Sequence, residues 1–456
     1  MRALISKQLA RSFTLGQCLG WWGVTLTIVV LGAHFLRAGN YSLTLCVMGV
    51  LFFHCSQSAW KNYSVAFFLL WGVVEWGQTA SFLILMRSKL GVPWFRGAAI
   101  IISVAFISSL SAIYVYKQAA NKNKVISEDW PRFKAVAFIS VFLFLLFIQS
   151  KAATPLLLLE RYFPLWGGVQ IFLAAWYAAV VADYLIDAKK SRKMRRKIWL
   201  VFSVIFFGQL FLGLMGFDKL LMTGKLHLPV PGFIILGPVY RGELSIMMPI
   251  LAVFSVLLTG TAWCSFLCYF GSFDAESAGS RPISRTLPYW LTSWLKFGRP
   301  GILIIGVILA LLLRTFAAPV NVVAGSVVLY VVASIVFIGI LSKKFGGMVH
   351  CISFCPMGLF ISVLGRLSFW RIKVDKEKCD DCGTCEKTCQ YRAITLDSRQ
   401  KGKTLMRCST CRDCLAGCSR KAIYLSHPLI PQPMQQPVFV LLVTVLHVVF
   451  LSVARV

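Results

Sequence analysis

Eight cysteines near the C-terminus fall into two runs with the same spacing. Each run reads C-x2-C-x2-C-x3-C, and together they comprise Cys379, Cys382, Cys385 and Cys389, then Cys408, Cys411, Cys414 and Cys418. A duplicated run of this kind is the ligand pattern of two [4Fe–4S] clusters, whereas zinc sites are built from separated C-x2-C pairs. The spacing therefore predicts iron–sulfur chemistry, in which metal centres accept and release electrons.

The short spacers indicate which thiols share a cluster, because three cysteines of a run surround one cube while the fourth points toward the other. The first cluster is predicted to use Cys379, Cys382, Cys385 and Cys418, and the second Cys408, Cys411, Cys414 and Cys389. Two apolar runs, 393–396 and 422–425, favour β-structure and are expected to pair as strands. Over about fifty residues the pattern resembles a bacterial-type ferredoxin. It departs from that family at Gln390 and Ser419, where a proline usually follows the fourth cysteine.

A second cysteine pattern, C-x3-C, occurs twice upstream of these runs. Residues 264–273 read CSFLCYFGSF and residues 351–360 read CISFCPMGLF, so the copies share both cysteines, a glycine and the last phenylalanine. Each copy follows two apolar spans, and a pseudo-twofold axis would bring Cys264, Cys268, Cys351 and Cys355 together. Three interpretations stay open: a third [4Fe–4S] cluster, redox-active dithiols, or thiols that only pack as small apolar groups.

The remaining composition indicates a membrane protein. Hydrophobic residues make up 58% of the 456 residues and charged residues only 14%, with a mean hydropathy of +0.74. Apolar runs near twenty residues recur, each long enough to cross a bilayer core of ~30 Å as a helix. About eleven spans are predicted, at 15–36, 41–59, 63–86, 97–116, 134–150, 167–187, 198–216, 243–262, 301–318, 323–341 and 436–453. The predicted fold is therefore mainly α: a polytopic transmembrane helical bundle with a small α+β ferredoxin domain inserted before the last span.

The order of spans and motifs divides the chain into four parts. These are a six-span N-terminal region at 1–190, a core with the duplicated two-span unit at 191–370, the ferredoxin domain at 371–430, and a C-terminal helix at 431–456. The heaviest basic loop, 189–197, is expected in the cytoplasm because cationic loops stay on that side. This orientation predicts a bacterial inner-membrane protein with its ferredoxin domain on the cytoplasmic side.

The net charge of +30 does not indicate nucleic-acid binding, because the Lys and Arg residues sit at helix ends, where they meet anionic lipid. Glu75 lies in the middle of a predicted span, and a carboxyl group in lipid is costly enough to suggest a quinone or proton site. Haem is not expected, since bis-histidine ligation needs two histidines at one depth and His34 with His447 is the single such pairing.

Residues 195–425 resemble the NapH/NosR-type membrane polyferredoxins. The resemblance rests on the basic loop, the segment 228–238, the two C-x3-C units and the two cluster motifs. Tyr269 departs from the family, which usually has a proline after the second cysteine, and residues 1–190 match no named family. The resemblance implies quinol oxidation at the membrane, with electrons passed through the clusters to other redox subunits of a membrane complex.

Two functions are compatible with the sequence. The first is an electron-transfer subunit that connects the quinone pool to a partner oxidoreductase. The alternative, drawn from accessory proteins of the same family, is a maturation factor that reduces a metal ion or thiols during assembly of another enzyme. No acid–base or nucleophile pattern marks a complete enzyme, so no catalytic residue is assigned.

Overall fold

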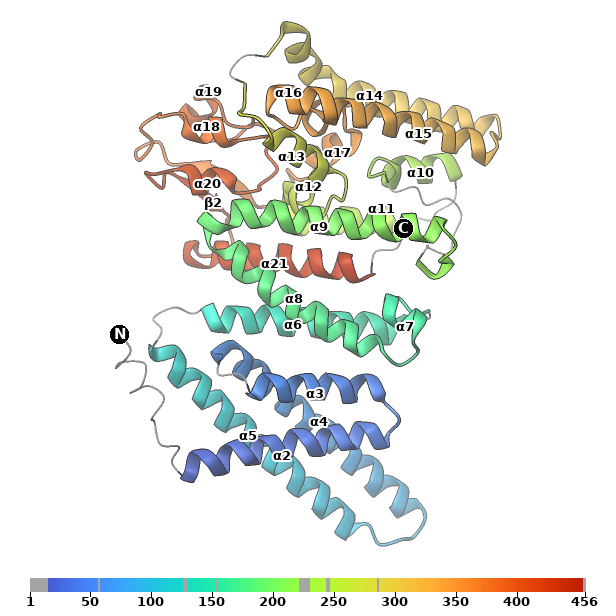
Figure 1. Cartoon of the computed structure of the whole chain (residues 1–456), viewed down its shortest axis with the longest axis vertical. Helices are drawn as coiled ribbons and strands as arrows, with labels where there is room; N and C mark the ends of the chain where they lie inside the picture. The colour runs from blue at the N-terminus through green and yellow to red at the C-terminus, as the bar shows by residue number, and fades with distance from the viewer. Residues whose placement is uncertain are drawn as a thin grey trace. The chain divides into compact units, whose positions relative to one another are not determined.

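The computed structural model describes residues 15–55, 58–125, 130–152, 154–220, 230–242, 247–284 and 287–453. This part of the chain is mainly helical and contains one two-stranded sheet, as the sequence predicts (Figure 1). The helices form two compact units, Met1–Val180 and Val181–Val456.

The first unit is held together by aromatic side chains. Its helices are α2 (Leu15–Arg37), α3 (Tyr41–Cys55), α4 (Ala59–Lys89), α5 (Phe95–Val125), α6 (Trp130–Lys151), α7 (Leu158–Tyr162) and most of α8 (Gly167–Ile186). Phe68 and Phe142 meet at 4.8 Å between ring centroids, and Phe53 contacts Phe138 and Phe172. These rings join α3, α4, α6 and α8 in a dry core, where aromatic pairs add to the energy of burial.

The second unit contains both C-x3-C copies. The first copy comprises α9 (Ala188–Leu214), the short turn η1 (Asp218–Leu220), α10 (Phe233–Arg241), α11 (Met247–Thr259), η2 (Gly260–Ala262), α12 (Trp263–Phe266) and α13 (Gly271–Gly279). The second comprises α14 (Tyr289–Thr315), α15 (Val320–Val336), η3 (Phe337–Ser342), α16 (Lys343–Phe345), η4 (His350–Phe354) and α17 (Pro356–Leu364). Segments η3 and η4 are π-helical, a geometry common at functional sites.

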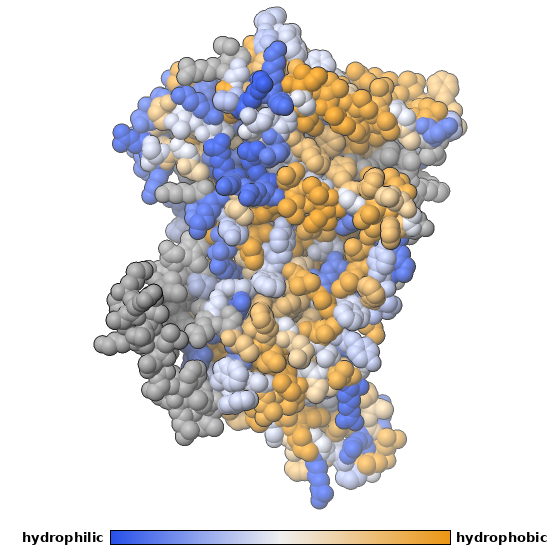
Figure 2. Space-filling model, in the orientation of Figure 1, coloured by the Kyte–Doolittle hydropathy of each residue, from blue (hydrophilic) through white to orange (hydrophobic). Residues whose placement is uncertain are grey.

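A small ferredoxin-like module follows, and the chain then returns to the helical bundle. The module consists of β1 (Arg371–Val374), α18 (Thr384–Thr388), α19 (Leu396–Gln400), α20 (Asp413–Gly417) and β2 (Ile423–Ser426). The last helix, α21 (Gln432–Val453), packs on α9 and α12 through His447, whose ring contacts Phe202 and whose Nδ1 lies 2.8 Å from the Phe266 carbonyl. Figure 2 shows hydrophilic side chains over the module and apolar side chains over α14 and α15.

Two expectations about the elements need correction. The strand predicted at 422–425 forms as β2, but it pairs antiparallel with β1, so the strand predicted at 393–396 is wrong. Thr395 instead caps α19: its side chain accepts a hydrogen bond from the Ser398 amide, and the Thr395 amide donates one to the Ser398 hydroxyl. This capping box satisfies two backbone donors that a strand pairing would otherwise have used.

The number of long apolar helices also differs from the prediction. Among the described residues, nine helices are long and apolar enough to cross a membrane, compared with the eleven predicted. The nine do not include α2 and α3, which form at the predicted spans 15–36 and 41–59. Helix α3 has only 15 residues; at 1.5 Å per residue it extends about 22 Å, short of a ~30 Å bilayer core.

Candidate metal centres

Four cysteines of the module line one cavity close to its surface. Its empty volume is about 330 Å³, and its wall includes Cys379, Cys382, Cys385 and Cys418, the set predicted for the first cluster. The Cys382 side chain is exposed, whereas Cys385 is buried. We call this set the outer site.

The other four cysteines of the module gather in its interior, and we call them the inner site. The Cys414 thiol lies close enough to Cys411, Cys389 and Cys408 for their charges to interact. Burial raises the pKa of the Cys389 thiol to about 12 and also raises that of Cys408. Such thiols stay neutral unless a bound cation stabilises the thiolate, which is the behaviour of a metal site.

The backbone explains why the two runs fold alike. Asp381 and Gly383 in the first run adopt positive φ, and Thr410 and Arg412 do so at the equivalent positions of the second run. Left-handed residues on both sides of a cysteine bend the loop tightly around a common centre. An amide also points at the fourth sulfur of each run: Ala393 N lies 3.3 Å from Cys389 Sγ, and Ala422 N lies 3.3 Å from Cys418 Sγ.

The four C-x3-C cysteines also line a single cavity, which we call the membrane site. Its wall includes Cys264, Cys268, Cys351 and Cys355, and its empty volume is about 430 Å³. The repeat therefore brings its four thiols together. Their role as ligands stays a prediction, like that of the eight module cysteines.

Both copies present the second cysteine in the same way. The Cys268 sulfur receives hydrogen bonds from the amides of Phe270 and Gly271 at the start of α13, and Cys355 receives them from Met357 and Gly358 at the start of α17. Amides directed at sulfur favour the thiolate, although burial still raises the pKa of Cys268 to about 12.

The glycine shared by the two copies has a steric reason. A Cβ atom on Gly358 would lie 3.0 Å from the Cys351 carbonyl oxygen and 3.2 Å from the Arg299 guanidinium, both closer than ordinary contacts. A Cβ atom on Gly271 would lie 2.8 Å from the Trp199 ring. A side chain at either position would therefore have to displace a neighbouring group, which glycine avoids.

Two arginines supply positive charge to the membrane site. Arg299 and Arg407 both line the cavity. Arg299 donates hydrogen bonds to the Cys351 and Gly358 carbonyls and to the Ser362 hydroxyl. Arg407 donates one to the Arg392 carbonyl. An oxidised [4Fe–4S] core with four thiolates carries a net charge of about −2. Two guanidinium groups and four converging sulfurs therefore fit such a group, since a buried charge needs a nearby counter-charge.

Asp274 and His350 form a further buried group beside Cys351. Asp274 Oδ2 accepts a hydrogen bond of 2.9 Å from the Cys351 amide, and one ligand atom from each of the three residues lies within 4.8 Å of the others. Burial raises the pKa of Asp274 to about 6 and lowers that of His350 to about 3, so the imidazole is neutral. The Asp274 carboxylate therefore holds the Cys351 loop through its backbone.

The membrane site and the inner site share a wall. Cys408 belongs to the inner site and also lines the membrane-site cavity, together with Tyr391 and Ser409. Three hydrogen bonds fasten this edge of the module to the helices: Met348 N donates to Gln390 O at 3.0 Å, Ser265 Oγ donates to Ser409 O at 3.0 Å, and the Thr261 and Thr410 hydroxyls lie 2.8 Å apart.

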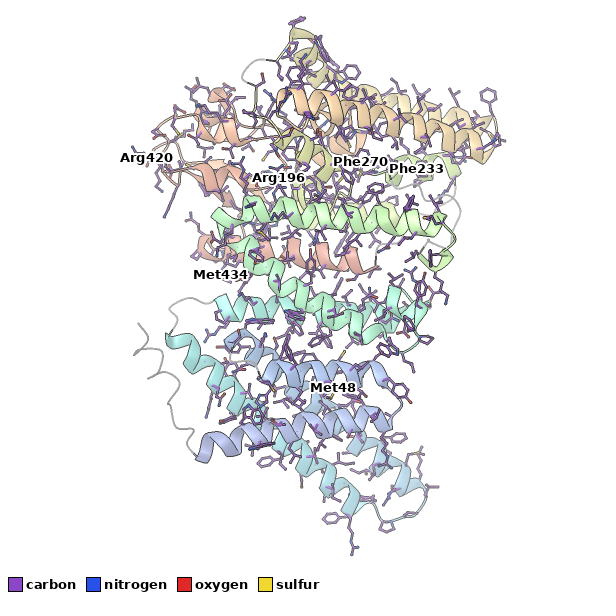
Figure 3. The ribbon with its side chains drawn as sticks, in the orientation of Figure 1. Met48, Arg196, Phe233, Phe270, Arg420 and Met434 are labelled. Atoms are coloured by element: carbon purple, nitrogen blue, oxygen red, sulfur yellow. The ribbon has the colours of Figure 1, made fainter. Side chains whose placement is uncertain are left out.

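The outer site lies away from this contact. Arg420, which lines the outer cavity, projects from the edge of the chain in Figure 3, on the side of the module away from Phe270. The second unit therefore places the inner site against the membrane site and leaves the outer site, with its exposed Cys382, at the surface.

Glu75, predicted for a quinone or proton site, lies in α4 of the first unit and is partly buried. The Thr79 hydroxyl donates to its backbone carbonyl at 2.9 Å. Its role stays a prediction.

Several residues of the sites were not predicted from the sequence, namely Arg299, Arg407, Asp274, His350 and Tyr391. Arg299 had a signal in the sequence, because an arginine within an apolar segment is costly and usually functional. The other four come together only through long-range packing.

Comparisons with known proteins find iron–sulfur domains over segments that carry these cysteine motifs. A family model described as a 4Fe-4S binding domain matches residues 241–280 and 326–374, which contain the two C-x3-C motifs. A second model with the same description matches residues 372–395, over the first module run.

Matching relatives cover less than half of this chain. An uncharacterized protein of Methanocaldococcus jannaschii is 24% identical over 213 residues, which are 46% of this chain and 82% of that protein. The "Putative electron transport protein YccM" of Escherichia coli is 27% identical over 223 residues, 45% of this chain and 58% of that protein. A ferredoxin of Pyrobaculum islandicum is 34% identical over 65 residues, 14% of this chain and 59% of that protein. No solved structure matches the chain.

The family matches and the long apolar helices together identify a multi-pass membrane protein with [4Fe–4S]-binding domains. Such domains carry out electron transfer.

Proposed function

We propose that this protein relays electrons between the quinone pool and a partner oxidoreductase, through three [4Fe–4S] centres arranged in series. The observation that carries the proposal is the position of Cys408, which lines the membrane-site cavity and belongs to the inner site of the module. The outer site, with Cys382 exposed, then provides the exit toward a partner.

Each site has the features that its place in the series requires. The membrane site offers four converging thiols and two arginines in a buried cavity. The inner site is buried between the membrane site and the rest of the module, so a centre there is shielded from water. The outer site lies at the surface, where another redox subunit can approach it. The printed name of the relative YccM, "Putative electron transport protein", supports electron transfer in general.

The quinol end of the proposal rests on the resemblance to the NapH/NosR-type proteins. Oxidation of one quinol to a quinone releases two electrons and two protons. A [4Fe–4S] centre accepts one electron at a time, so two centres take the pair while both protons leave to solvent. Glu75 is the candidate that we assign to the proton or quinone site, because a carboxyl group in mid-span is costly in lipid.

We further propose that the module faces the cytoplasm of a bacterial inner membrane, as the basic loop at 189–197 favours. Reporter fusions placed after Val374 and after Ala318 should give cytoplasmic and external signals respectively. The reverse pattern would place electron delivery on the opposite side of the membrane.

The test of the relay combines iron analysis with quinol reduction. An anaerobic preparation should contain about twelve iron atoms per chain, four for each centre. Replacing Cys264, Cys268, Cys351 and Cys355 together by serine should remove about four iron atoms and abolish reduction by a quinol analogue, while dithionite still reduces the module. Cys55→Ser removes an exposed thiol of α3 outside these sites and should change neither result.

Two outcomes would contradict the relay. Iron near eight atoms per chain that does not fall in the fourfold variant would exclude a centre at the membrane site. Quinol reduction of the module that persists without these four cysteines would show that electrons enter by another route.

A further inference from the structure

Tyr391 lies where the module meets the membrane site. It is 3% exposed and packs in a cluster with Trp199 of α9, Met348 and Ile352, against which Cys351 also packs. It also forms part of the wall of the cavity that holds the four C-x3-C cysteines. A residue of the module therefore completes the membrane site.

The Tyr391 hydroxyl has no hydrogen-bond partner among the described residues, although it is buried. Leaving a buried hydroxyl unsatisfied costs about 1–3 kcal/mol, and an acceptor held in the adjoining cavity would remove that cost. Cys351 and Cys264 are close enough for their charges to act on the phenol, and Cys411 of the inner site acts on it more weakly. The cavity that Tyr391 lines is also lined by the four C-x3-C cysteines, whose sulfurs can accept a hydrogen bond when they hold a centre.

The module consists of two similar halves, and only the half with Cys389 carries a tyrosine at this position. Residues 389–394 read CQYRAI and residues 418–423 read CSRKAI, so Tyr391 and Arg420 occupy equivalent positions. Arg420 lines the outer cavity and pairs with Asp380 at 3.2 Å, with its side chain mostly exposed. The half that faces water thus carries a cation with a partner, whereas the half that faces the membrane site carries a buried phenol without one.

We propose that Tyr391 is a positioning residue that donates a hydrogen bond to a sulfur atom of the centre held by Cys264, Cys268, Cys351 and Cys355. The proposal rests on the third centre of the proposed function. Hydrogen bonds to the sulfurs are among the factors that set the potential of an iron–sulfur centre. A donor at this position stabilises the reduced form, because the added negative charge strengthens the bond, and so raises the reduction potential of the membrane site. The module thereby tunes the centre from which it takes electrons.

The test is a potentiometric titration of the full chain followed by electron paramagnetic resonance, with Tyr391→Phe as the variant. Phenylalanine keeps the ring that packs on Trp199 and Met348 and removes only the hydroxyl. We expect iron to stay near twelve atoms per chain, the midpoint potential of the membrane centre to move to a more negative value, and those of the two module centres to stay unchanged. Tyr424→Phe is the matched control, because it removes the same group from β2, outside the cavity.

Each other outcome has a definite meaning. An unchanged midpoint potential with full iron overturns the role of Tyr391 and leaves the relay intact. A shift of the inner centre in place of the membrane centre assigns the hydroxyl to the inner site and also overturns the proposal. Iron near eight atoms in the unaltered chain overturns the third centre and the role of Tyr391 together.

A measurement on the unaltered chain covers the case in which the variant does not assemble. After exchange into deuterated water, deuterium electron–nuclear double resonance of the reduced membrane centre should detect a coupled deuteron in addition to those of the four amides that bond Cys268 and Cys355. Absence of this coupling in fully exchanged protein would contradict the hydrogen bond.

Discussion

Removing the Arg195 side chain should weaken the attachment of the module to the helices. Arg195 of α9 pairs with Asp413 of α20: Nε lies 3.2 Å from Oδ1, and the second nitrogen lies 2.6 Å from Oδ2. The side chains are 1% and 8% exposed, and the guanidinium also donates to the Ser265 carbonyl at 3.3 Å. This bidentate pair joins the helical bundle to the loop that carries Cys411 and Cys414.

The size of the effect follows from burial. Breaking a buried ion pair by removing one partner costs about 3–5 kcal/mol, because the other charge is left without compensation. The adjacent Arg196 provides a control, since it pairs with Glu276 at 3.2 Å but with side chains 22% and 59% exposed. Surface pairs contribute about 0–1 kcal/mol. Two neighbouring arginines on one helix should therefore differ several-fold in their effect on stability.

The assay is denaturant unfolding in detergent, followed by bleaching of the visible absorbance of the clusters. Arg195→Met should lower the free energy of unfolding by about 3–5 kcal/mol and Arg196→Met by less than about 1 kcal/mol. The double variant Arg195→Met with Asp413→Leu should recover much of the loss, because an apolar pair replaces the ion pair without an orphaned charge. Equal effects of the two arginine variants, or no recovery in the double variant, would refute the reasoning.

Two further predictions concern the geometry of the sites. Gly358→Ala should lower the free energy of unfolding by about 1–3 kcal/mol through overpacking and reduce the iron bound at the membrane site. The control is Gly325→Ala, which has open space for a Cβ atom and should leave the iron content unchanged. Equal iron in both variants would show that the close approach at α17 is dispensable. Cys389→Ser should damage the centre of the inner site and Cys418→Ser that of the outer site, as separate signals in electron paramagnetic resonance would show; damage to the centre of each cysteine's own run would contradict the crossed assignment.

Local sequence rules predict much of the sites because the cysteine motifs are short and repeated. The spacing of each run determines how far each sulfur can reach, and the outer cavity contains the four cysteines expected from that reach, Cys418 included. The C-x3-C repeat similarly brings its four thiols to one cavity. The turns within each motif span only a few residues, which is the range over which sequence patterns are informative, and the repetition of each motif indicates that the distant copies come together.

The predictions of local structure are wrong where one stretch of sequence is compatible with two structures. The run at 393–396 is apolar enough for a strand, but Thr395 and Ser398 have the spacing of a helix cap, and the cap determines the local structure. The span predicted at 301–318 overlaps α14, which begins earlier, at Tyr289, and continues through Pro300. Arg299 precedes the predicted span but lies inside this helix and lines the membrane-site cavity.

The charges beside the three sites differ in a way that a relay can use. At the membrane site, Arg299 and Arg407 bond carbonyls and a hydroxyl in the described part of the chain, so their charge is available to balance a buried anionic centre. At the outer site, Arg399 and Arg420 are neutralised by acids: Arg399 by Asp381 and Glu386, and Arg420 by Asp380. At the outer site, solvent screens the negative charge of the centre, because charges near the surface are well screened. Each added electron therefore meets compensation of a different kind, from fixed cations at the membrane site and from solvent at the outer site.

Electron delivery from the outer site should for this reason depend on ionic strength, while electron entry at the membrane site should not. Stopped-flow reduction of the clusters by a quinol analogue, and their oxidation by a soluble acceptor, would separate the two steps across a range of salt concentrations. Equal salt dependence of both steps would contradict this division of charge.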